Sequence, residues 1–186
     1  MTITLSSQYF RLIRLPEATF GLIGSGLATL GFFVPRIGLK LVQQYTPSKN
    51  LAILCALTFM GLLGMTFVLP YAGLLPTLIL HAVIILAGFF LSYYLNRITS
   101  SGQRATVLSI KGLSFNLAYG LIGLFYSRLL ALLRSQVSVE SLGRTLEDTL
   151  FVRSLVWFPW YFILCLIAFL ILARRQLRHS NEHKQL

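Results

Sequence analysis

Residues 93–109 read YYLNRITSSGQRATVLS, and two long apolar runs meet there. One run, 74–95, ends at this stretch, and the other, 105–124, begins inside it. Arg97 and Arg104 bracket the polar residues between the runs, and no acid lies among them. Each run is long enough to cross a bilayer, because about 20 helical residues span the roughly 30 Å of hydrocarbon. The basic link between them therefore predicts a cytoplasmic loop.

The composition is that of a membrane protein. The chain has 186 residues, of which 56% are hydrophobic and only 11% are charged, and its mean hydropathy is +0.76. A soluble domain carries about 25% charged residues. The net charge of +11 would suit a nucleic-acid partner, but the basic residues lie in short gaps between apolar runs and form no continuous basic face. We therefore expect an all-α integral membrane protein that does not bind nucleic acid.

Five apolar runs predict five transmembrane helices in a single transmembrane domain, residues 1–186. The expected helices are 17–34, 51–69, 71–95, 105–130 and 152–173. Pro35 is expected to close the first helix, and Pro76 to interrupt and kink the third. The remaining polar segments predict an outer loop, 134–149, and a frayed cytoplasmic tail, 174–186.

The distribution of basic residues predicts the orientation. With the C-terminus in the cytoplasm, the inner segments hold ten Lys and Arg residues and one acid, whereas the outer segments hold five basic residues and four acids. Cytoplasmic segments of membrane proteins carry the excess of Lys and Arg. We therefore expect the N-terminus outside and the C-terminus inside, in a plasma membrane of the bacterial inner-membrane type.

Small residues mark the first helix. Gly21, Gly24 and Gly26 could suggest a nucleotide-binding loop, but their order is wrong for the dinucleotide fingerprint and no strand precedes them. Gly21 and Ser25, like Gly24 and Ala28, are one helical turn apart. Small residues at this spacing let a second membrane helix approach closely, so we interpret them as a helix-packing face.

The fourth helix carries a sharper pattern of small and polar residues. It consists of Ser109, Gly112, Asn116, Gly120 and Gly123, spaced by 3, 4, 4 and 3 residues, so that they share one face. Small residues bring helix backbones together, and an asparagine can form a hydrogen bond across the contact. Three explanations stay open: packing within this chain, contact with a partner bundle, or a substrate path.

Ionisable groups are scarce inside the predicted helices. His81 is the one deep side chain that readily gains a charge near neutral pH, and Lys111 lies near an inner end, where it can snorkel. Such groups are costly in a membrane and often functional, yet a neutral histidine bonded to a neighbouring helix is an equal alternative. No acid lies within any of the five apolar runs, since Glu17 precedes the first of them, and we find neither a nucleophile–base pair nor a metal-binding cluster. We expect no catalytic residues, no metal, no cofactor and no enzymatic activity.

Two motifs carry a family resemblance. Residues 95–109, followed by a helix marked by Gly and Asn, resemble the junction between the tenth and eleventh helices of major facilitator superfamily transporters. Residues 31–40, GFFVPRIGLK, are similar to the degenerate repeat of that family's G-x-x-x-D-R-x-G-R-K signature, which falls between the eighth and ninth helices. The matching residues are Gly31, Arg36, Gly38 and Lys40. Pro35 stands in place of the acid, and Leu39 in place of an arginine.

The resemblance implies that the five helices correspond to the eighth to twelfth of a twelve-helix transporter. The third helix would then line the central cavity, and the first and fourth would face the other half of the transporter. The cavity candidates are His81 and Asn116, and the cytoplasmic gate would hold Arg36, Lys40, Arg97 and Arg104.

The function expected from this resemblance is the C-terminal portion of a secondary active transporter, which moves a small solute by alternating access. The family fold needs two six-helix bundles. The expected partners are therefore the lipid bilayer, the N-terminal helices of a full transporter from the same or a split gene, and a small-molecule substrate. We expect this chain to be a truncated part that is not competent alone. The alternative is a small polytopic membrane-assembly or scaffold protein without transport activity.

Overall fold

The computed structural model describes residues 6–135 and 146–182, with side chains up to residue 175. These residues form helices and no strands. The α-helices are α1 (Ser6–Leu12), α2 (Phe20–Gln44), α3 (Pro47–Thr66), α4 (Leu74–Ile98), α5 (Arg104–Arg134) and α6 (Leu146–Glu182). Two short 3-10 turns, η1 (Glu17–Thr19) and η2 (Ser101–Gln103), precede α2 and α5. Within the described part, five helices are long and apolar enough to cross a membrane, which agrees with the predicted class.

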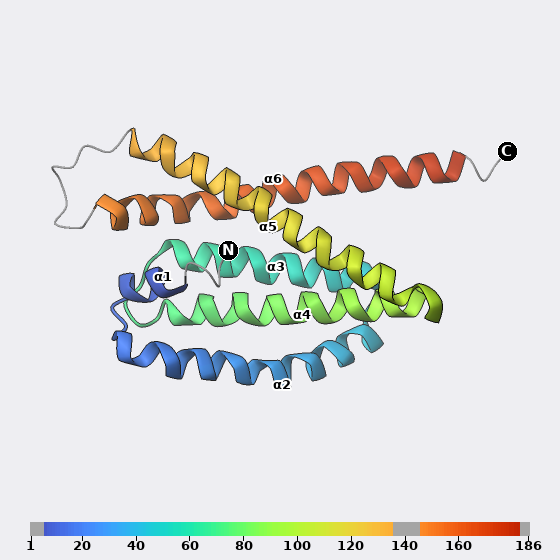
Figure 1. Ribbon diagram of the computed structural model, residues 1–186, viewed down its shortest axis with the longest axis horizontal. Coiled ribbons are helices and arrows are strands. Elements are labelled where there is room, and N and C mark those ends of the chain that lie inside the picture. Colours follow the sequence, from blue (N-terminus) through green and yellow to red (C-terminus); the bar gives the residue numbers. More distant parts are fainter. Residues whose placement is uncertain (1–5, 136–145, 183–186) are drawn as a thin grey trace.

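The five long helices alternate in direction, so that their ends gather at two ends of the molecule (Figure 1). Helix α4 packs against both α2 and α3, α3 also packs against α6, and α6 packs against α5. We call the end where α4 finishes and α5 begins the basic end. Its described charged residues are all cationic: Arg36, Lys40, Lys49, Arg97, Arg104, Lys111, Arg174 and Arg175. The described acids, Glu17, Glu147 and Asp148, lie at the opposite end, which we call the α1 end.

The prolines do not act as the sequence predicted. Helix α2 continues through Pro35 to Gln44, and it bends toward α4 over its last turns (Figure 1). A proline is tolerated inside a membrane helix when the surroundings satisfy the carbonyl that it frees. Pro76 falls in the first turn of α4, where no intrahelical N–H bond is lost, so the predicted kink is wrong.

Helices α3 and α6 also differ from the prediction at their ends. Helix α3 begins at Pro47, because Thr46 Oγ1 accepts a hydrogen bond from Lys49 N at 3.4 Å and a proline suits the first helical position. Helix α6 begins at Leu146 and runs to Glu182. The helix therefore takes up the end of the predicted loop and most of the predicted frayed tail. The predicted loop residues 136–145 lie outside the described residues.

The best-packed core lies at the α1 end, and the sequence did not predict the helix that fills it. Tyr9 and Ile13 are fully buried and Phe10 is 5% exposed. They pack with buried side chains of four long helices, namely Leu27, Met65, Leu80, Phe151 and Leu155. The backbone joins in, since Tyr71 N donates to Ile13 O at 2.9 Å. Helix α1 therefore closes this end of the bundle.

Candidate functional site

The small and polar stripe of α5 is uncovered. Ser109, Gly112, Asn116, Gly120 and Gly123 are all exposed. A Cβ atom added to any of the three glycines would meet nothing within 4 Å. Packing within this chain, the first of the three explanations for the stripe, is therefore not observed among the described residues.

Helix α2 shows the same condition along its first half. Gly21, Gly24, Gly26 and Gly31 are exposed, and a Cβ atom added at each would meet nothing within 4 Å. Such spaces are where a neighbouring membrane helix would fit closely. None of the described helices packs against these glycines. That another helix packs there therefore stays a prediction.

His81 lies on α4 and is half-buried. It forms no hydrogen bond with any residue that the structure describes, so the alternative of a histidine bonded to a neighbouring helix is not observed. Gly88 and Ser92 follow it at spacings of 7 and 4, and these spacings place all three on one face of α4. Ser92 contacts α5 through Lys111. The histidine therefore shares the α4 face that approaches α5.

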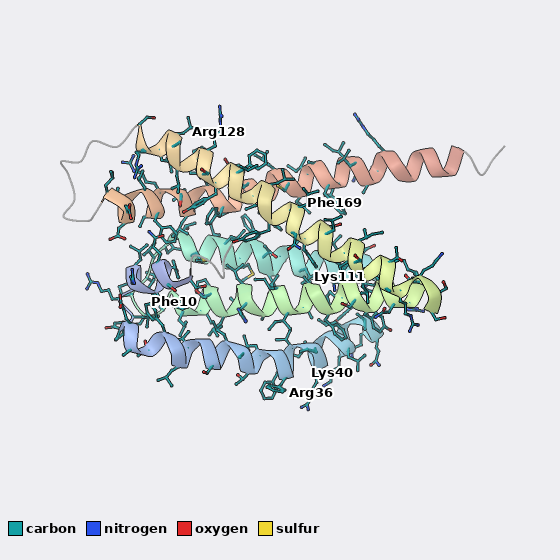
Figure 2. All side chains as sticks on the ribbon, in the orientation of Figure 1. Phe10, Arg36, Lys40, Lys111, Arg128 and Phe169 are labelled. Atoms are coloured by element: carbon teal, nitrogen blue, oxygen red, sulfur yellow. The ribbon has the colours of Figure 1, made fainter. Side chains whose placement is uncertain are left out.

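The four predicted gate residues are exposed. Arg97 and Arg104 stand on either side of the α4–α5 turn. Arg36 and Lys40 lie inside α2 and not in a loop, which corrects the position implied by the family signature. Figure 2 shows both on the side of α2 that faces away from α4. The described contacts do not bring these two residues together with the arginines of the turn.

Gly38 has a packing role that the motif did not predict. A Cβ atom at this position would lie 2.6 Å from Phe89 Cδ1 of α4. Val34 and Val42, one turn before and after it, are buried against Leu86 and Phe90. Gly38 therefore allows α2 to pack closely against α4.

Asn50 is a buried polar residue that sequence reasoning missed. It is fully buried in the first turn of α3. Its Nδ2 donates to Tyr94 OH at 2.8 Å and to Leu41 O at 3.3 Å. One side chain thus ties three helices together at the basic end. The signal was hidden because a polar residue beside Lys49 resembles a loop residue.

A hollow of about 440 Å³ opens at the α1 end, between α1, α5 and α6. Its polar lining residues are Gln8, Tyr126, Ser127, Arg134 and Glu147. None of the predicted site residues lines it. No group of three or more His, Cys, Asp or Glu side chains in the described part of the chain could hold a metal ion.

Comparison with known proteins adds no assignment: no family model, no curated protein and no solved structure matches this chain.

Proposed function

We propose that this chain is the C-terminal portion of a secondary active transporter, which moves a small solute by alternating access against a second bundle of helices. The observation that carries the proposal is the uncovered stripe of α5. Its glycines leave notches, and Asn116 presents an amide at the middle of a span.

Lipid is a poor cover for such a face. Moving an amide from water into hydrocarbon without a hydrogen-bond partner costs roughly 2–7 kcal/mol. A second helix fits the notches closely and can pair with the amide. The stripe is therefore suited to a protein partner more than to lipid.

The uncovered glycines of α2 extend the same argument to a second helix. Two separate helices with open small-residue faces suit a partner with several helices better than a single one. Transporters of this kind form their substrate site between two bundles. In our proposal His81, on the α4 face that approaches α5, and Asn116 contribute to that site.

The alternative function is a membrane-assembly or scaffold protein without transport activity. The α1 core favours it in one respect, since Tyr9, Phe10 and Ile13 already close four of the long helices, α2, α3, α4 and α6, at one end. In that case the open faces of α2 and α5 would hold a different membrane protein.

The stripe can be tested without knowing the substrate. We would express the gene with its upstream DNA and attach a nitroxide spin label to Gly120→Cys or Leu121→Cys, both at exposed positions of α5. Oxygen dissolves in lipid, so a label under a protein partner collides with it less often. We expect the label at 120 to be at least fivefold less accessible to oxygen than the label at 121, which lies off the stripe. Equal accessibility would overturn the proposal.

The upstream DNA separates the two functions. Seven further spans in frame before Met1 support the transporter, and a stop codon with local start signals supports the scaffold. In the complete protein, His81→Ala and Asn116→Leu should each change the kinetics of uptake. Unchanged kinetics in both variants would remove these residues from the site.

A further inference from the structure

Lys111 and Ser92 form a polar contact between α5 and α4 near the basic end. Lys111 Nζ donates to Ser92 Oγ at 2.6 Å, and Ser92 Oγ donates its own hydrogen to Gly88 O at 2.8 Å. The serine hydroxyl thus accepts from the ammonium and holds it beside α4. An ammonium has three donors, so two N–H groups of Lys111 remain for another acceptor.

The described part of the chain supplies no counter-anion for this ammonium. The ion pair between Arg11 and Glu17 lies at the α1 end, far from Lys111 along the bundle. Every described charged side chain at the basic end is a cation, as given above. The electrostatic potential around Lys111 is therefore positive, which attracts anions from outside the protein.

The position of Lys111 along α5 places it near the surface of the bilayer. Helix α5 has 31 residues, so at 1.5 Å per residue it exceeds the hydrocarbon thickness by about 16 Å, or about 8 Å at each end. Lys111 lies about 10 Å from the first residue of the helix by the same rise. Its backbone is thus near the boundary between hydrocarbon and headgroups, where the phosphate groups of lipids lie.

The neighbours of Lys111 on its own helix suit the rest of a lipid. Leu108 and Phe115 lie three residues before and four after it, so the three share a face. Leu108 is 42% exposed and Phe115 is 51% exposed, and Lys111 Nζ lies 5.9 Å from the centre of the Phe115 ring. Phe115 lies on the side of Lys111 toward the membrane interior, as an acyl chain lies on that side of its headgroup.

We propose that Lys111 and Ser92 form a binding site for the phosphate group of an anionic phospholipid at the basic end of the bundle. Ser92 positions the ammonium, the two free N–H groups bind phosphate oxygens, and an acyl chain lies along Phe115. The site does not depend on the transport activity proposed above, because it uses only α4 and α5 of this chain.

Native mass spectrometry of the full chain in detergent micelles tests the site, with dioleoyl phosphatidylglycerol as the probe. We expect Lys111→Met to weaken lipid binding at least fivefold and Lys111→Arg to stay within twofold of the original chain. The matched control is Lys49→Met, which removes an exposed lysine from the same end and should change binding less than twofold. Equal losses in the two methionine variants would show a diffuse charge effect and overturn the proposal.

A second measurement uses the unmodified chain and therefore decides the question even where Lys111→Met does not fold. Reductive methylation of lysines, followed by peptide mass spectrometry, reports whether Lys111 is covered. Phosphatidylglycerol should slow methylation of Lys111 at least threefold and leave Lys49 unaffected. Equal protection by inorganic phosphate would assign the site to a free anion, and the absence of protection would remove the site. Either result overturns the lipid assignment.

Discussion

Tyr9 and Asn50 are both fully buried, and each carries one polar atom without a hydrogen-bond partner in the described structure. The atoms are the Tyr9 hydroxyl and Asn50 Oδ1. An unsatisfied buried polar atom costs about 1–3 kcal/mol. For Tyr9, burial of the aromatic ring in the core offsets this cost. For Asn50, the two hydrogen bonds that its amide nitrogen donates to neighbouring helices offset it. Each residue yields a prediction.

For Tyr9 we predict a pH-dependent stability. Burial raises the pKa of Tyr9 from 10.0 to about 12. A folded pKa above the unfolded value means that the contribution of the neutral phenol is fully present below pH 10 and is lost as the pH rises through 12. Thermal unfolding in detergent should show that Tyr9→Phe is as stable as the original chain, or more so, at pH 8. Its advantage should grow between pH 10 and 12, and a constant difference would contradict the assignment.

For Asn50 we predict coupling with Tyr94. Asn50→Leu should cost about 1–3 kcal/mol of unfolding free energy, because Tyr94 OH and Leu41 O lose a donor. Tyr94→Phe removes only the tyrosine partner and should cost less, about 0.5–1.5 kcal/mol. Denaturant unfolding of the two single variants and the double variant gives the coupling energy. Strictly additive losses would show that the 2.8 Å bond contributes nothing.

At the scale of the helices, several glycines stand where neighbouring segments approach closely. A Cβ atom at Gly61 would lie 2.6 Å from Leu80 Cγ, and one at Gly73 would lie 2.7 Å from Ile13 Cγ2. The glycines of the α5 stripe meet nothing. The same residue type therefore occurs in two environments in this chain, covered and open, and the sequence pattern does not distinguish them.

Helix α2 holds a matched pair of glycines that tests this distinction. Gly38→Ala forces α2 away from Phe89 and should cost about 1–3 kcal/mol, as overpacking does in other cores. The methyl group added by Gly31→Ala, on the same helix, would meet no neighbouring atom within 4 Å. This variant should leave the free energy of unfolding unchanged or raise it by up to about 1 kcal/mol. Thermal unfolding of the two variants measures the contrast. A loss at Gly31 equal to that at Gly38 would contradict it.

At the scale of the whole molecule, the alternating helices sort the charges. Tight connections such as Tyr45–Thr46, between α2 and α3, force successive helices to run in opposite directions. Three segments far apart in sequence consequently lie at one end (Figure 1), and these segments carry the residues of the basic end. Cytoplasmic segments of membrane proteins are enriched in Lys and Arg, so we propose that the basic end faces the cytoplasm.

Cysteine labelling tests this orientation. In a background with both native cysteines replaced by serine, we would introduce Lys49→Cys, Arg104→Cys or Asp148→Cys. A membrane-impermeant maleimide added to intact cells should label only the cysteine at 148, which lies at the α1 end. Permeabilised cells provide the control, since all three cysteines should then react. Labelling of 49 and 104 on opposite sides would contradict the alternating arrangement itself.

The sequence by itself determined the helical class, the five apolar segments and the segregation of basic residues. These properties follow from local composition, because a long apolar run has few alternatives to a membrane helix. The α4–α5 turn was also placed correctly, since the polar residues around Arg97 and Arg104 interrupt two unbroken runs. Helix ends were predicted less well, because Pro35, Thr46 and Pro76 act through capping and local geometry.

Only the tertiary structure decided which small residues are covered and which polar residues are paired. Helix α1 is too short to be predicted from periodicity, yet its Tyr9 is fully buried in the core. The Lys111–Ser92 contact and the three-helix contacts of Asn50 join residues far apart in sequence. No local pattern encodes such pairs, because they depend on how far neighbouring helices approach one another.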